Sequence, residues 1–143
     1  MTTEAVIVST ARTGVGKAYR GALNNTEGPT LAGHVMAEVV KRAGIAAGEV
    51  EDVVMGCAMQ QGTMVMNVAR KGAIRAGLPV TVAGTTIDRQ CASGLQAIAV
   101  AARSVMHGPH GVLASRVTTT VAPSSRNNSA RRWAMSVLKA DSV

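Results

Sequence analysis

The feature that most constrains the fold is the regular alternation of β-branched segments with segments of helical period over the first hundred or so residues. Three predicted strands lie at 4–9, 51–55 and within 80–87, and three predicted helices cover 30–43, 67–76 and 91–106. Alternation in the order β-α-β-α-β-α is typical of layered α/β folds whose sheet is largely parallel. We therefore predict an α/β fold with helices packed on a mostly parallel sheet.

The ends of the first two helices are well marked. Thr30 is a suitable N-cap for the first helix, and Gly44 can end it in a left-handed conformation. Between them, apolar residues at four-residue spacing make one face: Leu31, Val35, Val39 and Ala43. Asn67 is a suitable N-cap for the second helix, which Gly77-Leu78-Pro79 would stop. The third helix is apolar nearly all round, which predicts that it is buried.

The pattern fails after Pro109. Residues 115–129 are mostly Ser, Thr, Arg and Asn and show no clear strand, and residues 131–138 predict only a weak helix. We therefore divide the chain into an amino-terminal domain at 1–108 and a divergent tail at 109–143, which we expect to be disordered or the product of a frameshift.

Charge and composition limit the classes of function. The net charge is +7 in a chain of 143 residues, and after residue 102 the chain carries one acidic residue, Asp141, and six basic ones: Arg103, Arg116, Arg126, Arg131, Arg132 and Lys139. A basic arm for nucleic acid is one reading, but no stacking aromatics accompany these arginines, and we expect no nucleic-acid partner. No apolar run is long enough to cross a membrane, and no signal peptide is recognisable. We expect a cytoplasmic protein.

The two cysteines, Cys57 and Cys91, fit neither a disulfide framework nor the spacing of a zinc site. Cys91 follows a predicted strand and a short turn and opens the third helix. There the helix dipole and nearby N–H groups favour the thiolate, which is the nucleophile of acyl transfer between thioesters. A lone Cys near a helix start can also be a small buried apolar residue, and that is how we interpret Cys57.

The segment Asp88-Arg89-Gln90-Cys91-Ala92-Ser93-Gly94-Leu95-Gln96-Ala97-Ile98 resembles the acyl-enzyme signature of the thiolase family. Further segments agree in the same order. They are residues 6–14 with Gly16-Lys17, then Val53-Val54-Met55-Gly56, Asn67-Val68-Ala69-Arg70 and Ala76-Gly77-Leu78-Pro79. Gly14 stands where the family usually has Pro. The resemblance runs from about residue 4 to residue 106 and covers the amino-terminal part of a thiolase.

The resemblance implies a thiolase-like layered fold, of which this chain would be an incomplete amino-terminal half. It also implies an acyltransferase in which Cys91 attacks acetyl-CoA or a 3-ketoacyl-CoA and becomes the acyl-thioester nucleophile, in fatty-acid β-oxidation or acetoacetyl-CoA formation. The backbone N–H of Cys91 would donate to the oxyanion. The CoA thioester is then the substrate, and no metal or separate cofactor is implied.

In the family, a His in a Gly-His-Pro motif activates the nucleophile and a Cys in a Cys-x-Gly motif acts as general acid and base. Neither motif occurs here. His34, His107 and His110 lie outside it, and Gly108-Pro109-His110 has the wrong order. His34 lies in an amphipathic helix, which favours a surface or packing role. We therefore expect this truncated chain to lack activity by itself, because each proton-transfer role contributes roughly 10²–10⁴-fold.

Three origins remain open for the residues after about Met106: a frameshift or altered end, a genuine short paralogue with a new tail, or one half of a split enzyme. The alternative function is a non-catalytic fragment or docking module that binds a full-length thiolase. Beyond acyl-CoA and CoA, the expected partners are copies of the same chain or the missing carboxy-terminal half. The sequence leaves acyl chain length, substrate-binding residues, cleavage versus condensation and oligomeric state undetermined.

Overall fold

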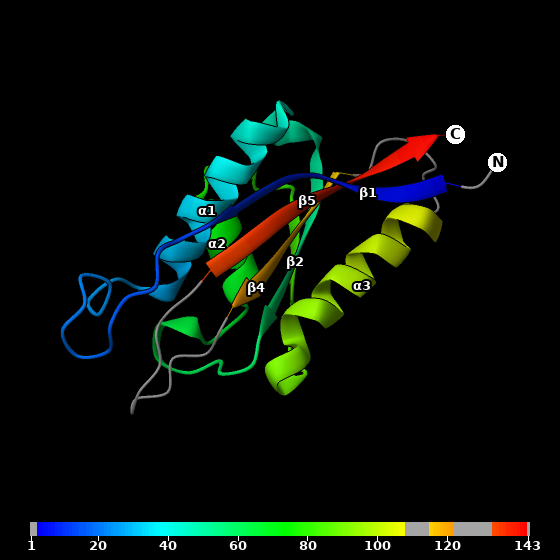
Figure 1. The fold of residues 1–143 in the computed structure, drawn as a ribbon. Coiled ribbons are helices and arrows are strands. Elements are labelled where there is room, and N and C mark those ends of the chain that lie inside the picture. Colours follow the sequence, from blue (N-terminus) through cyan, green and yellow to red (C-terminus); the bar gives the residue numbers. More distant parts are fainter. Residues whose placement is uncertain (1–2, 108–114, 122–132, 143) are drawn as a thin grey trace.

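In the computed structural model, residues 3–107, 115–121 and 133–142 are described. They form one five-stranded sheet in the order β1-β5-β4-β2-β3 (Figure 1). The strands are β1 (Thr3–Arg12), β2 (Val50–Cys57), β3 (Ala83–Ile87), β4 (Ser115–Val121) and β5 (Trp133–Ser142). β2 pairs in parallel with both β3 and β4, whereas β5 is antiparallel to its neighbours β1 and β4. Four of the five strands therefore run in one direction, which agrees with the prediction of a mostly parallel sheet.

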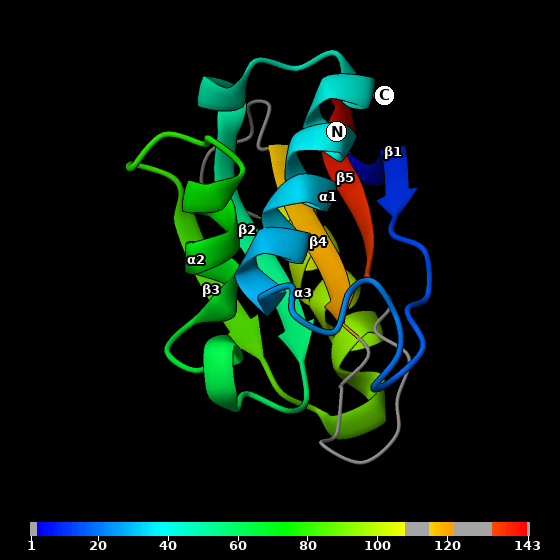
Figure 2. The ribbon, with the colours of Figure 1, turned by 90° about the vertical axis from the view of Figure 1, so that its left-hand side faces the viewer.

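Helices cover both faces of the sheet. α1 (Gly28–Ala43) and α2 (Val68–Arg75) lie on one face, and α3 (Ser93–His107) lies on the other (Figure 1; Figure 2 shows the first face). This arrangement confirms the predicted layered α/β fold. It also places the start of α3 beside the carboxyl end of β2 (Figure 1).

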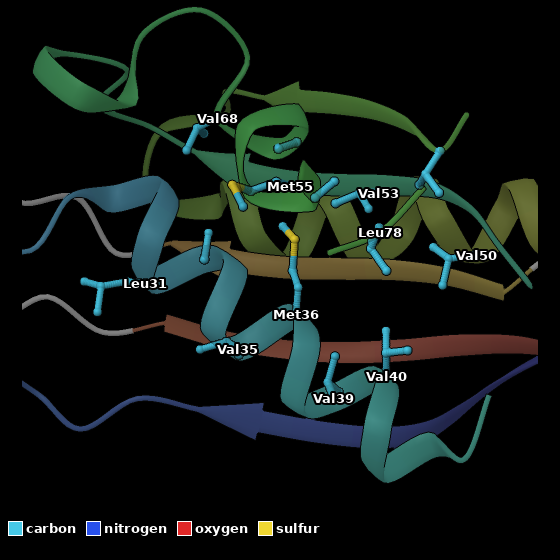
Figure 3. Close-up of a cluster of buried hydrophobic side chains, with 14 of the residues drawn as sticks. Leu31, Val35, Met36, Val39, Val40, Val50, Val53, Met55, Val68 and Leu78 are labelled. Carbon is cyan, nitrogen blue, oxygen red and sulfur yellow. The ribbon is translucent and has the colours of Figure 1, made fainter. Parts of the chain in front are cut away.

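Alternating side chains of β2 supply the core on both sides of the sheet. Val53 and Met55 are fully buried against α1 and α2, and Met36 points from α1 toward this cluster (Figure 3). Val54 faces the other way and packs with Ala97, Ala101 and Val105 of α3. Coverage on both faces explains why the second part of β2, from Val53 to Cys57, has no charged residue.

The start of α1 differs from the prediction. The helix begins at Gly28 with Glu27 at the N-cap and Pro29 in the first turn, and not after a Thr30 cap. Proline suits the first turn because its missing N–H has no helical acceptor there. The Thr30 hydroxyl instead accepts a hydrogen bond from Arg75 of α2, whose guanidinium also contacts the Glu27 carboxylate at 2.7 Å. Thr30 therefore ties α1 to α2, while Gly44 ends α1 in the left-handed region with φ 67°, as predicted.

The tail also differs from the prediction where it is described. Residues 115–121 form β4, and the weak helix predicted at 131–138 is wrong because Trp133–Ser142 is a strand. Both strands take central places in the sheet, where pairing with β1 and β2 supplies the hydrogen bonds that the local sequence does not predict. The boundary predicted at 108 lies outside the described residues, and the frameshift origin remains a prediction.

Candidate active site

Cys91 lies in the turn that joins β3 to α3. A short 3₁₀ turn, Gln90–Ala92, follows β3, and α3 begins at Ser93, within two residues of the predicted start. Gln90 has a φ of 48°, in the left-handed region that non-glycine residues rarely adopt. Such a conformation costs on the order of 1–3 kcal/mol and persists only where surrounding contacts hold it. Cys91, the next residue, is exposed.

Hydrogen bonds hold this turn on both sides of Cys91. The Gln90 N–H donates to the Asp88 carboxylate at 2.9 Å, and the Ala92 N–H donates to the Arg89 carbonyl at 3.0 Å. The Ser93 N–H donates to the Gln90 carbonyl. Within the described part of the chain, the N–H of Cys91 has no hydrogen-bond partner. One donor beside the exposed thiol thus has no partner among the described residues.

The buried side chain of Ser93 bonds the backbone of this turn. Its side chain is 2% exposed, and its hydroxyl accepts from the Arg89 N–H at 2.8 Å and donates to the Gln90 carbonyl at 2.6 Å. The same hydroxyl therefore fixes the peptide group between Asp88 and Arg89 and the one between Gln90 and Cys91. No role was predicted for Ser93 from the sequence. The available signal was a serine at the start of a helix, where short hydroxyl side chains often bond neighbouring backbone groups.

Gly56 brings the start of α3 onto the sheet. It lies in β2 opposite Ile87 of β3, and a Cβ atom there would lie 2.4 Å from the carbonyl carbon and oxygen of Ser93. Real Cβ atoms essentially never come so near to backbone atoms, so any larger residue would push the helix start away. The segment Val53-Val54-Met55-Gly56 is one of those that resemble the thiolase family in the same order. Its last residue, Gly56, is where the start of α3 packs against β2.

Cys57 lies at the end of the same strand and is fully buried, which confirms its interpretation as a small core residue. Burial raises the pKa of its thiol to about 11, and the Asp88 carboxylate adds to this effect, while a backbone hydrogen bond from Met59 opposes it. Cys57 is therefore a protonated thiol over the physiological pH range, in contrast to a nucleophile that must ionise.

A second set of contacts fixes β3, the strand that leads into the turn. Asn67, the predicted cap of α2, accepts from the Arg70 N–H at 3.3 Å and donates from its amide to the Gly84 carbonyl at 2.8 Å. Its carbonyl oxygen also accepts from the Thr86 hydroxyl at 2.9 Å. The guanidinium of Arg70 donates to the carbonyls of Val80 and Val82, each at 2.6 Å. The motif Asn67-Val68-Ala69-Arg70 thereby attaches α2 to β3.

The remaining candidates lie elsewhere. His34 is exposed on the outer side of α1, in agreement with a surface role, and His107 is exposed at the end of α3, whereas His110 lies outside the described residues. Within the described ranges, no group of three or more His, Cys, Asp and Glu side chains is placed to hold a metal ion. No described helix is long and apolar enough to cross a membrane.

The outer face of α3 is the main departure from the predicted burial of that helix. Gly94, Ala97, Ala101 and Val105 face the sheet and are buried, whereas Leu95 is 72% exposed. The prediction of a helix buried all round is therefore wrong for the described residues. Leu95 belongs to the same turn of helix that follows Cys91, so an apolar surface adjoins the exposed thiol.

Comparisons with known proteins identify the family of this chain. The family described as "Thiolase, N-terminal domain" matches residues 5–116. The 3-ketoacyl-CoA thiolase of Bacillus subtilis is 45% identical over 107 residues, which are 75% of this chain and 27% of that protein. An acetyl-CoA acetyltransferase of Syntrophomonas wolfei is 37% identical over 145 residues, with 100% of this chain and 36% of that protein covered.

A solved structure shows the same fold. The acetyl-CoA acetyltransferase of Bacillus anthracis superposes with a TM-score of 0.74 and 37% sequence identity over 85% of this chain and 30% of that chain. The chain thus spans about a quarter to a third of the length of the relatives that it matches. By sequence and by fold, the chain belongs to the thiolase family and corresponds to an amino-terminal part of it.

Proposed function

We propose that this chain carries the nucleophile of a thiolase-type acyltransferase that acts on acetyl-CoA and 3-ketoacyl-CoA in the cytoplasm. The observation that carries the proposal is the turn at Cys91, where an exposed thiol adjoins a backbone N–H without a described partner. A thiol that accepts an acyl group needs access for the thioester and a donor for the oxygen that becomes negative. The family signature at 88–98 supplies the reaction class.

In the proposed step, the Cys91 thiol loses its proton and Sγ attacks a carbonyl carbon, which is the thioester carbon C1 of acetyl-CoA or the keto carbon C3 of a 3-ketoacyl-CoA. A new carbon–sulfur bond forms, and the carbonyl electron pair moves to oxygen, where the Cys91 N–H donates to it. With acetyl-CoA, the bond to the CoA sulfur then breaks and the CoA thiolate takes a proton. With a 3-ketoacyl-CoA, the carbon–carbon bond between C2 and C3 breaks, and the acetyl-CoA carbanion takes the proton.

The acyl group then passes from Cys91 to CoA for cleavage, or to the acetyl-CoA carbanion for condensation. Both directions need a base near the thiol and an acid for the leaving group. The sequence has neither the Gly-His-Pro nor the Cys-x-Gly motif, and the exposed His34 and His107 belong to other parts of the fold. We therefore propose that turnover requires groups from further chain, and that the separate chain is limited to slow acylation of Cys91.

Intact-mass measurement after incubation with acetyl-CoA tests the proposal. We expect one added acetyl group, located on Cys91 by peptide mapping and absent in Cys91→Ala. Cys57→Ala is the matched control and should be acetylated like the wild type, because Cys57 is buried. Addition of the carboxy-terminal part of the Bacillus subtilis relative should speed acylation. A folded wild type that takes iodoacetamide on Cys91 but never an acetyl group would contradict the proposal.

The exposed Leu95 favours a second candidate, a non-catalytic module that docks on a full-length thiolase. The residue is exposed on a helix that packs its other face on the sheet, so it offers an apolar contact to a partner. Co-purification with a full-length relative would support this candidate, provided that Leu95→Lys abolishes it and that Cys91 remains unacetylated in the complex. Acetylated Cys91 in that complex would favour the acyltransferase instead.

A further inference from the structure

The hydroxyl of Ser93 is the contact that determines the shape of the turn around Cys91. It makes its two hydrogen bonds to consecutive residues, with the Arg89 N–H as donor and the Gln90 carbonyl as acceptor. Gln90 is the residue with φ 48°, and the bond to its carbonyl acts on the peptide group that joins Gln90 to Cys91 and carries the Cys91 N–H. The bond from the Arg89 N–H acts on the peptide group that joins Asp88 to Arg89. The Ser93 backbone is itself fixed against Gly56, where the glycine allows a contact that no Cβ atom could fit.

This arrangement decides which N–H of the turn is left without a partner. The Ser93 hydroxyl takes up the Arg89 N–H, the Asp88 carboxylate takes up that of Gln90, and carbonyls within the turn take up those of Ala92 and Ser93. Cys91 carries the N–H that has no described partner. Without the Ser93 hydroxyl, Arg89 would lose its acceptor and Gln90 would lose a contact that holds its left-handed backbone. The direction of the next N–H, that of Cys91, would then no longer be fixed.

We propose that Ser93 is a positioning residue that holds the Cys91 N–H toward the carbonyl oxygen of an incoming thioester. The inference rests on the proposed acyl transfer to Cys91 and adds to it a residue that touches neither substrate nor thiol. Its effect is specific to reactions that develop a negative oxygen. Attack on a thioester creates such an oxygen, whereas alkylation by iodoacetamide displaces iodide at carbon and creates none.

The test compares two reactions of the same thiol in the full chain. We expect Ser93→Ala to slow acetylation of Cys91 by acetyl-CoA roughly tenfold or more, which is a partial loss of one oxyanion donor. Alkylation by iodoacetamide should stay within about twofold, since it uses the thiolate without an oxyanion. Ser93→Thr keeps the hydroxyl and should restore most of the acetylation rate. Ser104→Ala changes a serine farther along α3 and should change neither rate.

The outcomes separate the inference from the function on which it rests. An equal fall of both rates in Ser93→Ala would reveal a general loss of structure and overturn the positioning role, as would an unchanged acetylation rate. A wild type that is alkylated but never acetylated would contradict the proposed function alone. In that event, amide hydrogen exchange decides: faster exchange at Arg89 in Ser93→Ala supports the contact, and unchanged exchange overturns it.

Discussion

At the scale of single residues, the two cysteines differ in reactivity because they differ in exposure. Cys91 is exposed in a turn, whereas Cys57 ends β2 with no exposed surface and lies within the field of Asp88. Burial disfavours the thiolate more strongly than the Met59 backbone hydrogen bond favours it, so the pKa of Cys57 rises from 9.0 to about 11. Only Cys91 combines a thiol with access to a substrate.

This shift predicts a pH dependence of stability. In the unfolded chain, Cys57 loses its proton near its ordinary pKa of 9.0, but in the folded chain only near 11. Between these values the folded state binds more protons, so the stabilisation is complete below pH 9 and is lost as the pH rises through 11. The shift corresponds to about 2–3 kcal/mol. Urea unfolding across this range should show a fall for the wild type that Cys57→Ala lacks.

Cys91→Ala is the control for that experiment, because it leaves the buried thiol in place. It should show the same fall as the wild type between pH 9 and 11, apart from titration that all three proteins share. An identical pH dependence in the wild type and Cys57→Ala would contradict the role of burial at Cys57.

At the scale of elements, the junction between β2 and α3 depends on the absence of a side chain at Gly56. In Gly56→Ala the new methyl would overlap the carbonyl group of Ser93, and we expect a loss of about 2 kcal/mol or more in the free energy of unfolding. Displacement of the helix start should also slow acetylation of Cys91. Gly48→Ala is the matched control, since open space surrounds Gly48 and the change should be neutral or slightly stabilising. Urea unfolding and intact mass measure both effects, and an unchanged Gly56→Ala would refute the contact.

The start of α2 allows a finer prediction, because Asn67 combines a left-handed backbone with side-chain bonds. Asn67 has a φ of 58° and caps α2 through Arg70 while it bonds Gly84 and Thr86 of β3. Asn67→Gly removes the side chain but accepts the backbone. Loss of the cap costs only a few tenths of a kcal/mol, and loss of the bonds to Gly84 and Thr86 brings the expected cost to about 1–2 kcal/mol. Asn67→Ala should cost about 1 kcal/mol more, because alanine resists a positive φ. Equal stabilities of the two variants in urea would show that the left-handed backbone matters little.

These elements also show how far sequence predicts structure. The caps at Asn67 and Gly44 and the turn at Cys91 are local features, and the residues involved indicate them directly. Thr30 was wrongly predicted as the N-cap of α1. The sequence is compatible with two starts of the helix, because Pro29 suits the first turn as well as Thr30 suits the N-cap position. The two hydrogen bonds of Ser93 were missed because they depend on the φ of Gln90, which has no signal in the sequence. β4 and β5 were missed because their pairing with distant strands determines them.

At the scale of the whole molecule, we propose that the outer face of α3, which carries the exposed Leu95, is an interface. The chain spans 27–36% of the length of two thiolase relatives, and Leu95 projects from the helix that carries the proposed nucleophile turn at its start. Exposed apolar surface of this kind promotes association. We therefore predict that the separate chain self-associates and that Leu95→Lys shifts it toward the monomer, as measured by sedimentation velocity at several concentrations.

Ile74→Lys is the matched control for Leu95→Lys, because Ile74 is a 54% exposed apolar residue on α2, across the sheet from α3 (Figure 1). If association reflects the α3 face, Ile74→Lys should associate like the wild type, since a charge on the far side of the sheet leaves Leu95 in place. Equal effects of the two variants would instead indicate general solubility. A wild-type chain that sediments as one monomer and unfolds cooperatively would show that the chain is stable without a partner on the outer face of α3. The apolar surface beside Cys91 would then be available to the acyl chain of a substrate.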